Sequence, residues 1–165
     1  MDICKWLALV LPALQDRVNK DMQVVLEDFA RRNTLYSSSA FFQSAFKGSD
    51  ILNVELKNLL EKTSALRLWI RDLEKIKSTC VEFIETEYDS ICECCQKKTS
   101  AVDARENPDF LEKYLRNKNE ALALLDLYVQ VQKQTIRDRR KGVFWDVIKI
   151  LIGGLIGALV SRFFK

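Results

Sequence analysis

Residues 143–164 read VFWDVIKILIGGLIGALVSRFF, and this C-terminal stretch decides how the rest of the chain is interpreted. No polar side chain occurs between Ile150 and Val160, and aromatic residues flank this run on both sides. Aromatic side chains at both ends of an apolar helix are typical of a helix that meets the two interfaces of a membrane. The stretch therefore predicts a C-terminal apolar membrane helix attached to a body that precedes it.

The length of the stretch leaves its mode of attachment open. A helix needs about 20 mostly apolar residues to cross a bilayer core of about 30 Å, yet Asp146 and Lys149 lie within the first third and Arg162 lies near the end. A short span with its cations drawn to the interfaces is one interpretation. An amphipathic helix lying in the interface is the second. A buried helix of a soluble bundle is the third, although each glycine there costs about 1 kcal/mol.

Three groups of residues make up the predicted membrane site. Lipid contact is expected from the large apolar and aromatic side chains, which are Phe144, Trp145, Ile150, Leu151, Ile152, Leu155, Ile156, Leu159, Val160, Phe163 and Phe164. Close helix packing is expected at Gly153 and Gly157, whose spacing lets two membrane helices approach. Contact with lipid headgroups is expected from the cations, which are Arg137, Arg139, Arg140, Lys141, Lys149 and Arg162.

The charge of the chain is concentrated beside this stretch. The formal net charge is +3, but seven basic and two acidic residues lie from Arg137 onwards, so the residues before Arg137 carry −2. A body with that balance has no electrostatic surface for nucleic acid. Basic residues next to an apolar segment instead favour anionic lipid and keep their side of the membrane in the cytosol. We therefore expect anionic membrane lipid as a partner and a cytoplasmic body.

Upstream of the stretch, apolar residues recur at helical spacing. From Ile3 the pattern predicts a first helix that ends near Arg32 and is kinked or restarted at Pro12. Residues 34–49 contain three consecutive serines and are expected to form a loop with a short amphipathic turn. The phenylalanines of this connector either cover the core or contact a partner.

A heptad-like apolar pattern then runs from Leu52 to Ile91. With Asp50 as its cap and an end after Cys95, it predicts one helix of about 45 residues, as in a coiled coil or long bundle. Asn107 and Pro108 are suited to begin the next helix, whose apolar pattern ends at Ile136. The predicted fold is all-α, an elongated antiparallel bundle of three long helices over residues 1–136. Residues 137–142 would form a basic hinge containing Gly142, and residues 143–164 the membrane helix.

The sequence contains little that points to catalysis. It has no histidine, and its five glycines form no phosphate-binding loop. Cys92, Cys94 and Cys95 form a CxCC cluster, for which packing, acylation by lipid, and metal or redox chemistry are the alternatives. We expect no enzymatic activity, no cofactor and no metal site.

The expected function is therefore a class of role. We expect a membrane-attached helical bundle that acts through protein contacts as an adaptor or regulator. The sequence does not identify the protein partner, and the spacing of Gly153 and Gly157 favours homo-oligomerisation. The alternative is a membrane-active effector whose C-terminal helix oligomerises and permeabilises a bilayer, as toxins, lysis proteins and cell-death effectors do.

Overall fold

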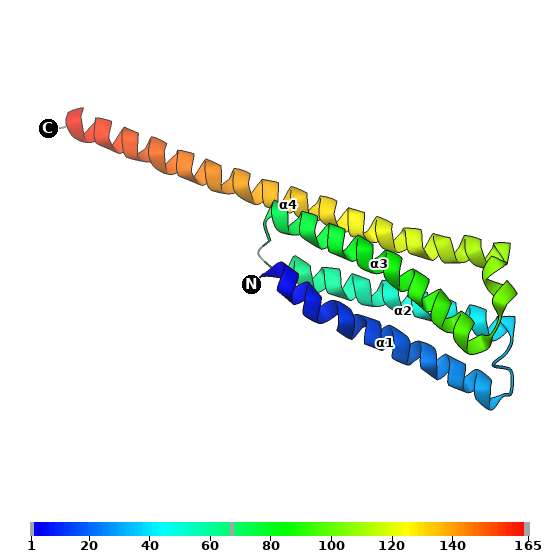
Figure 1. The fold of residues 1–165 in the computed structure, drawn as a ribbon. Coiled ribbons are helices and arrows are strands. Elements are labelled where there is room, and N and C mark those ends of the chain that lie inside the picture. Colours follow the sequence, from blue (N-terminus) through cyan, green and yellow to red (C-terminus); the bar gives the residue numbers. More distant parts are fainter. Residues whose placement is uncertain (1, 67, 164–165) are drawn as a thin grey trace.

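A computed structural model describes the backbone of residues 2–66 and 68–163, and all of its regular structure is helical. Within this part consecutive helices run antiparallel in an up-and-down bundle (Figure 1). α1 and α4 lie on opposite sides of the central pair, α2 and α3. The elements are α1 (Ile3–Arg31), α2 (Ser38–Ser64), α3 (Ile70–Thr99), the 3₁₀ helix η1 (Val102–Glu106) and α4 (Pro108–Phe163).

The first helix follows the sequence closely. The Asp2 side chain caps α1 by accepting a hydrogen bond from the backbone N–H of Cys4 at 3.0 Å. Pro12 lies inside α1 without ending it, and its ring is on the exposed side of the helix. The buried residues recur every three or four positions and are Ile3, Leu7, Leu11, Leu14, Val18, Met22 and Leu26. This row forms the face of α1 that packs on α2 and α3.

The loop predicted for residues 34–49 is wrong over most of its length, because α2 already begins at Ser38. Ser37 acts as the helix cap, and its hydroxyl accepts a hydrogen bond from the N–H of Ala40 at 3.1 Å. Serine at this position starts a helix, whereas three serines in a row had suggested a break. The Phe41 side chain is fully buried, and its ring centroid is 5.0 Å from that of Phe110 on α4. The connector therefore contributes to the core.

The prediction of one long helix from Leu52 to Ile91 is also wrong. α2 ends at Ser64 and α3 begins at Ile70 in the opposite direction, so two helices of 27 and 30 residues replace one. At about 1.5 Å per residue they are about 40 and 45 Å long and match each other closely. Turning back buries the apolar rows of both halves against each other, which a single rod could not do. The bundle consequently has four helices where the sequence had suggested three.

The start of α4 confirms a predicted helix boundary. The helix then continues past residues 136 and 142, where the sequence predicted further boundaries. Asn107 caps α4 through its side-chain oxygen, which accepts a hydrogen bond from Phe110 N–H at 3.0 Å, and Pro108 is the first helical residue, as predicted. α4 is 56 residues long and passes through Gly142 without a break. Its N-terminal half packs antiparallel to α3, whereas its C-terminal half projects from the end of the bundle (Figure 1).

One acidic side chain is buried between α1 and α3. Glu87 is 3% exposed, and Oε1 of its carboxyl group accepts a hydrogen bond from Nε2 of Gln15 at 2.6 Å. Burial raises the pKa of Glu87 above its ordinary value of 4.5. The folded chain therefore holds this proton at a pH at which the unfolded chain has released it, and stability falls as pH rises through the raised pKa.

Replacing Glu87 by glutamine should therefore make the free energy of unfolding less dependent on pH. Glutamine keeps an acceptor for Gln15 and has no proton to lose, so the variant should gain stability over the unchanged chain as pH rises above 4.5. Urea unfolding followed by circular dichroism between acidic and neutral pH would measure the difference. A difference that stays constant with pH would show that Glu87 does not titrate differently on folding.

Candidate functional site

The segment of α4 that projects beyond the bundle carries a dense set of exposed apolar side chains. The last buried residue of α4 in the described part is Ile136. After it, large apolar side chains point to solvent, and these are Val143, Phe144, Trp145, Val147, Ile150 and Ile152. We call residues 137–152 the projecting segment. Exposed apolar patches of this density mark surfaces that bind a partner or a membrane.

The apolar row that faces the core in the bundle continues into the projecting segment. Val143 follows Ile136 after seven residues, and Val147 and Ile150 follow after four and three more. Residues at these spacings lie on one side of a helix. Inside the bundle this side packs on α2 and α3, whereas in the projecting segment Val143, Val147 and Ile150 are all exposed. The same helical face thus changes from core to exposed apolar surface.

The predicted headgroup cations lie where α4 leaves the bundle. Arg137, Arg139, Arg140 and Lys141 are all exposed. The acidic residue among them, Asp138, accepts hydrogen bonds from Nε2 of Gln134 at 3.1 and 3.2 Å. Four positive charges and one negative charge within five residues give this turn of the helix a strongly positive surface.

The charged pair predicted inside the apolar stretch is present. Nζ of Lys149 lies 3.8 Å from Oδ1 of Asp146, and both side chains are exposed. Asp146 is three residues after Val143 and four before Ile150 and therefore borders the row that these residues form, whereas Lys149 lies further from it around the helix. From Val143 to Ile152 the sequence therefore gives the helix a narrow polar side, formed by Asp146 and Lys149, and a broad apolar one.

The remaining part of the predicted membrane helix falls largely outside the described side chains. These predicted residues are Leu151, Gly153, Leu155, Ile156, Gly157, Leu159, Val160, Arg162 and Phe163, and Phe164 lies beyond the described backbone. Among the residues that the structure describes, no helix combines the length and the apolarity needed to cross a membrane. The predicted transmembrane helix thus receives no support from the structure.

The cysteine cluster lies within the bundle. Cys92 and Cys95 are buried on α3 together with Cys80, and Cys94 is partly exposed. Burial raises the pKa of Cys95 and of Cys80 to about 12, and it raises the pKa of Cys92 as well. The buried thiols therefore stay protonated at neutral pH, where the thiolate is the reactive and metal-binding form. Within the described residues no group of three or more metal-binding side chains comes together.

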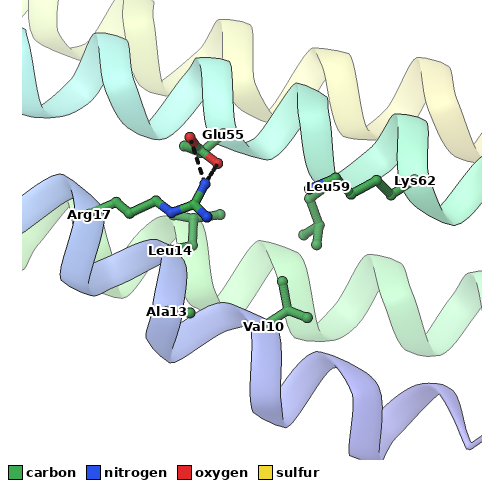
Figure 2. A pocket seen from close by; sticks show the side chains of 7 residues that line it. All are labelled: Val10, Ala13, Leu14, Arg17, Glu55, Leu59 and Lys62. Atoms are coloured by element: carbon green, nitrogen blue, oxygen red, sulfur yellow. Dashed lines mark hydrogen bonds and ion pairs between the residues drawn. The ribbon is translucent and has the colours of Figure 1, made fainter.

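A small groove between α1 and α2 has the geometry of a structural contact. Figure 2 shows Arg17 of α1 reaching across to Glu55 of α2. Nη1 of Arg17 lies 3.1 and 3.2 Å from the two carboxylate oxygens of Glu55. Arg17 and Glu55 therefore pair with each other, and the groove, which Lys62 also lines, encloses only about 60 Å³. The Arg17–Glu55 pair links α1 to α2.

A larger groove lies beside the point where α4 leaves the bundle, and the sequence did not indicate it. It encloses about 220 Å³ and is lined by Leu68, Trp69, Ile136, Arg139, Arg140 and Val143. Leu68 and Trp69 belong to the turn between α2 and α3, within the stretch that had been predicted to be one helix. A signal for this turn would have been Leu68 and Trp69, two large apolar residues at positions that the heptad spacing of Leu66, Ile70 and Leu73 does not use.

Comparisons of the chain with known protein families, with curated proteins and with solved structures found no match.

Proposed function

We propose that the chain is a non-enzymatic helical bundle that the C-terminal part of α4 attaches to an anionic membrane surface, with the bundle in the cytosol. One observation carries the proposal. α4 continues past the last core layer and exposes aromatic and aliphatic side chains, among them Trp145 at 59% exposure. Holding such a surface in water is costly, at about 25 cal/mol for each Å² of apolar area. Insertion into a bilayer interface removes that cost.

The charges beside this surface favour anionic lipid as the partner. The four exposed cations at residues 137–141 lie one to two turns before Phe144 and Trp145. Each lysine or arginine held near an anionic leaflet contributes about 1 kcal/mol. Apolar insertion and charge attraction together provide the two signals that stable attachment to a membrane requires.

The bundle itself is proposed to act through protein contacts, as an adaptor or regulator. Its outer surface on α4 exposes Leu115, Leu127 and Val131 within the part that packs on α2 and α3. Leu127 and Val131 are one turn apart and lie on the same side of the helix. A helix side of this kind suits a partner helix that lays its own apolar side against it.

Vesicle flotation tests the attachment directly. The chain should float with phosphatidylcholine vesicles that contain phosphatidylserine, and should bind less to phosphatidylcholine alone or at high salt, because salt screens the attraction. Extraction of the floated protein by carbonate would identify interfacial attachment, and resistance would identify a spanning helix.

Two results would change the proposal. A chain that stays at the bottom of the gradient with both lipid mixtures would contradict membrane attachment. Release of a trapped dye from the vesicles at low protein-to-lipid ratio would favour the membrane-permeabilising effector over the adaptor.

A further inference from the structure

Tryptophan is an unusual residue at the position that Trp69 occupies, the N-terminus of α3. Trp69 is the N-cap residue of α3, and its side chain makes no capping hydrogen bond. Serine, threonine, aspartate and asparagine are preferred here because their side chains accept hydrogen bonds from the free N–H groups. Trp69 is also 64% exposed, so the core does not explain its presence. The Trp69 side chain therefore contributes little packing to the bundle and remains accessible for another contact.

The backbone at Trp69 is nevertheless held in place. The carboxylate of Asp72 accepts a hydrogen bond from the N–H of Trp69 at 2.9 Å, and the carbonyl oxygen of Trp69 accepts one from the N–H of Asp72 at the same distance. The indole therefore projects from a fixed point on the first turn of α3. It is the kind of rigid aromatic side chain that binding surfaces use as an anchor.

Trp69 lies beside the basic turn of α4. The guanidinium carbon of Arg140 is 5.8 Å from the centre of the indole ring, which is within the range of a cation–π interaction. Arg139 lines the same groove, and Arg71 is exposed two residues after Trp69. Two acidic groups lie nearby, Asp72, which binds the Trp69 backbone, and Asp138, which binds Gln134, and the three arginines outnumber them by one charge. The rim of the groove is therefore positive.

The groove and the projecting segment form one continuous surface. Val143 lines the groove and also begins the exposed apolar row that continues with Val147 and Ile150. The start of α3 lies next to α4 at the end of the bundle from which α4 projects (Figure 1). A surface that meets the first turns of the projecting segment therefore lies close to Trp69 as well.

We propose that Leu68, Trp69, Arg139 and Arg140 form a second membrane contact, which docks the end of the bundle on the same anionic bilayer as the projecting segment. This inference rests on the proposed function and adds the orientation of the bundle to it. Leu68 and Trp69 enter the boundary between headgroups and acyl chains, the depth at which tryptophan is enriched. Arg139 and Arg140 bind the lipid phosphates, as planar guanidinium groups do.

Tryptophan quenching in the full-length chain tests this contact separately from the projecting segment. The double substitution Trp6→Phe and Trp145→Phe leaves Trp69 as the only indole, and Trp6→Phe with Trp69→Phe leaves Trp145. Each protein is mixed with phosphatidylserine-containing vesicles whose phosphatidylcholine carries brominated acyl chains. Both indoles should be quenched and blue-shifted. Quenching of Trp145 without Trp69 would overturn the second contact and leave the proposed function intact, whereas quenching of neither would overturn both.

The affinity of the vesicles for two further variants provides a matched comparison. Trp69→Ala should weaken binding roughly tenfold, as expected for loss of one interfacial aromatic side chain. Tyr36→Ala removes an aromatic side chain that is 79% exposed in the connection between α1 and α2, at the opposite end of the bundle, and should leave binding unchanged. Equal binding by Trp69→Ala and the unchanged chain would contradict the proposal.

Discussion

Replacing Phe144, Trp145 and Ile150 together by glutamine should weaken binding of the chain to anionic vesicles roughly a thousandfold. All three side chains are exposed on the projecting segment. Burial of a large apolar side chain is worth about 1.5 kcal/mol at the lower end of the usual range, so the three together contribute about 4–5 kcal/mol. Glutamine is a good helix former, and α4 should remain helical. Titration of vesicles against the labelled chain measures the change.

The same helix offers a matched control. Leu115, Leu127 and Val131 are also exposed, but they lie on the part of α4 that packs within the bundle. Their replacement by glutamine removes the same number of exposed apolar side chains and leaves the charge unchanged. Vesicle binding should stay within about twofold of the unchanged chain. Equal losses in the two triple variants would show that general surface apolarity, and not the projecting segment, governs attachment.

The second large effect concerns the core. Leu56→Ala should lower the free energy of unfolding by about 2–5 kcal/mol, because it removes buried methyl groups and leaves a cavity. Leu56 is fully buried on α2, one of the two central helices. Neighbouring helices hold the surrounding side chains from both sides, so little collapse into the cavity is expected. Urea unfolding followed by helical circular dichroism gives the difference directly.

Val54→Ala is the corresponding control on the same helix. Val54 is 59% exposed, two residues before Leu56 and on the other side of α2. Its truncation should change the free energy of unfolding by no more than about 0.5 kcal/mol. If the two variants lost similar stability, the assignment of the buried side of α2 would be wrong.

Helical periodicity predicted the class of fold and several of its details. The buried row of α1 and the start of α4 at Asn107 and Pro108 agree with the sequence, because local capping and amphipathic spacing determine them. The reversal between α2 and α3 was not predicted, since no glycine or proline interrupts the pattern between Leu52 and Ile91. A heptad pattern describes which side of a helix is buried, and it remains intact when the helix doubles back onto the same core.

The candidate site was predictable only in part. The cations at residues 137–141 and the exposed aromatic residues Phe144 and Trp145 are local features of one helix, and sequence indicates them well. Trp69 is about 70 positions from Arg140 in the chain, so their proximity depends on how α3 packs against α4. The missed turn hid this pair, because a tryptophan within a long predicted helix resembles an ordinary core residue.

The continuity of α4 through Gly142 fixes the orientation of the projecting segment relative to the bundle. Because the helix has no break, its part in the bundle and its projecting segment keep a fixed orientation about the helix axis. Each residue of a helix corresponds to about 1.5 Å of rise and about 100° of turn. Because α4 is unbroken between Ile136 and Trp145, the direction in which Ile136 packs into the core fixes the direction in which the Trp145 side chain points. The packing of α4 on α2 and α3 thus determines which side of the projecting segment faces a bound surface.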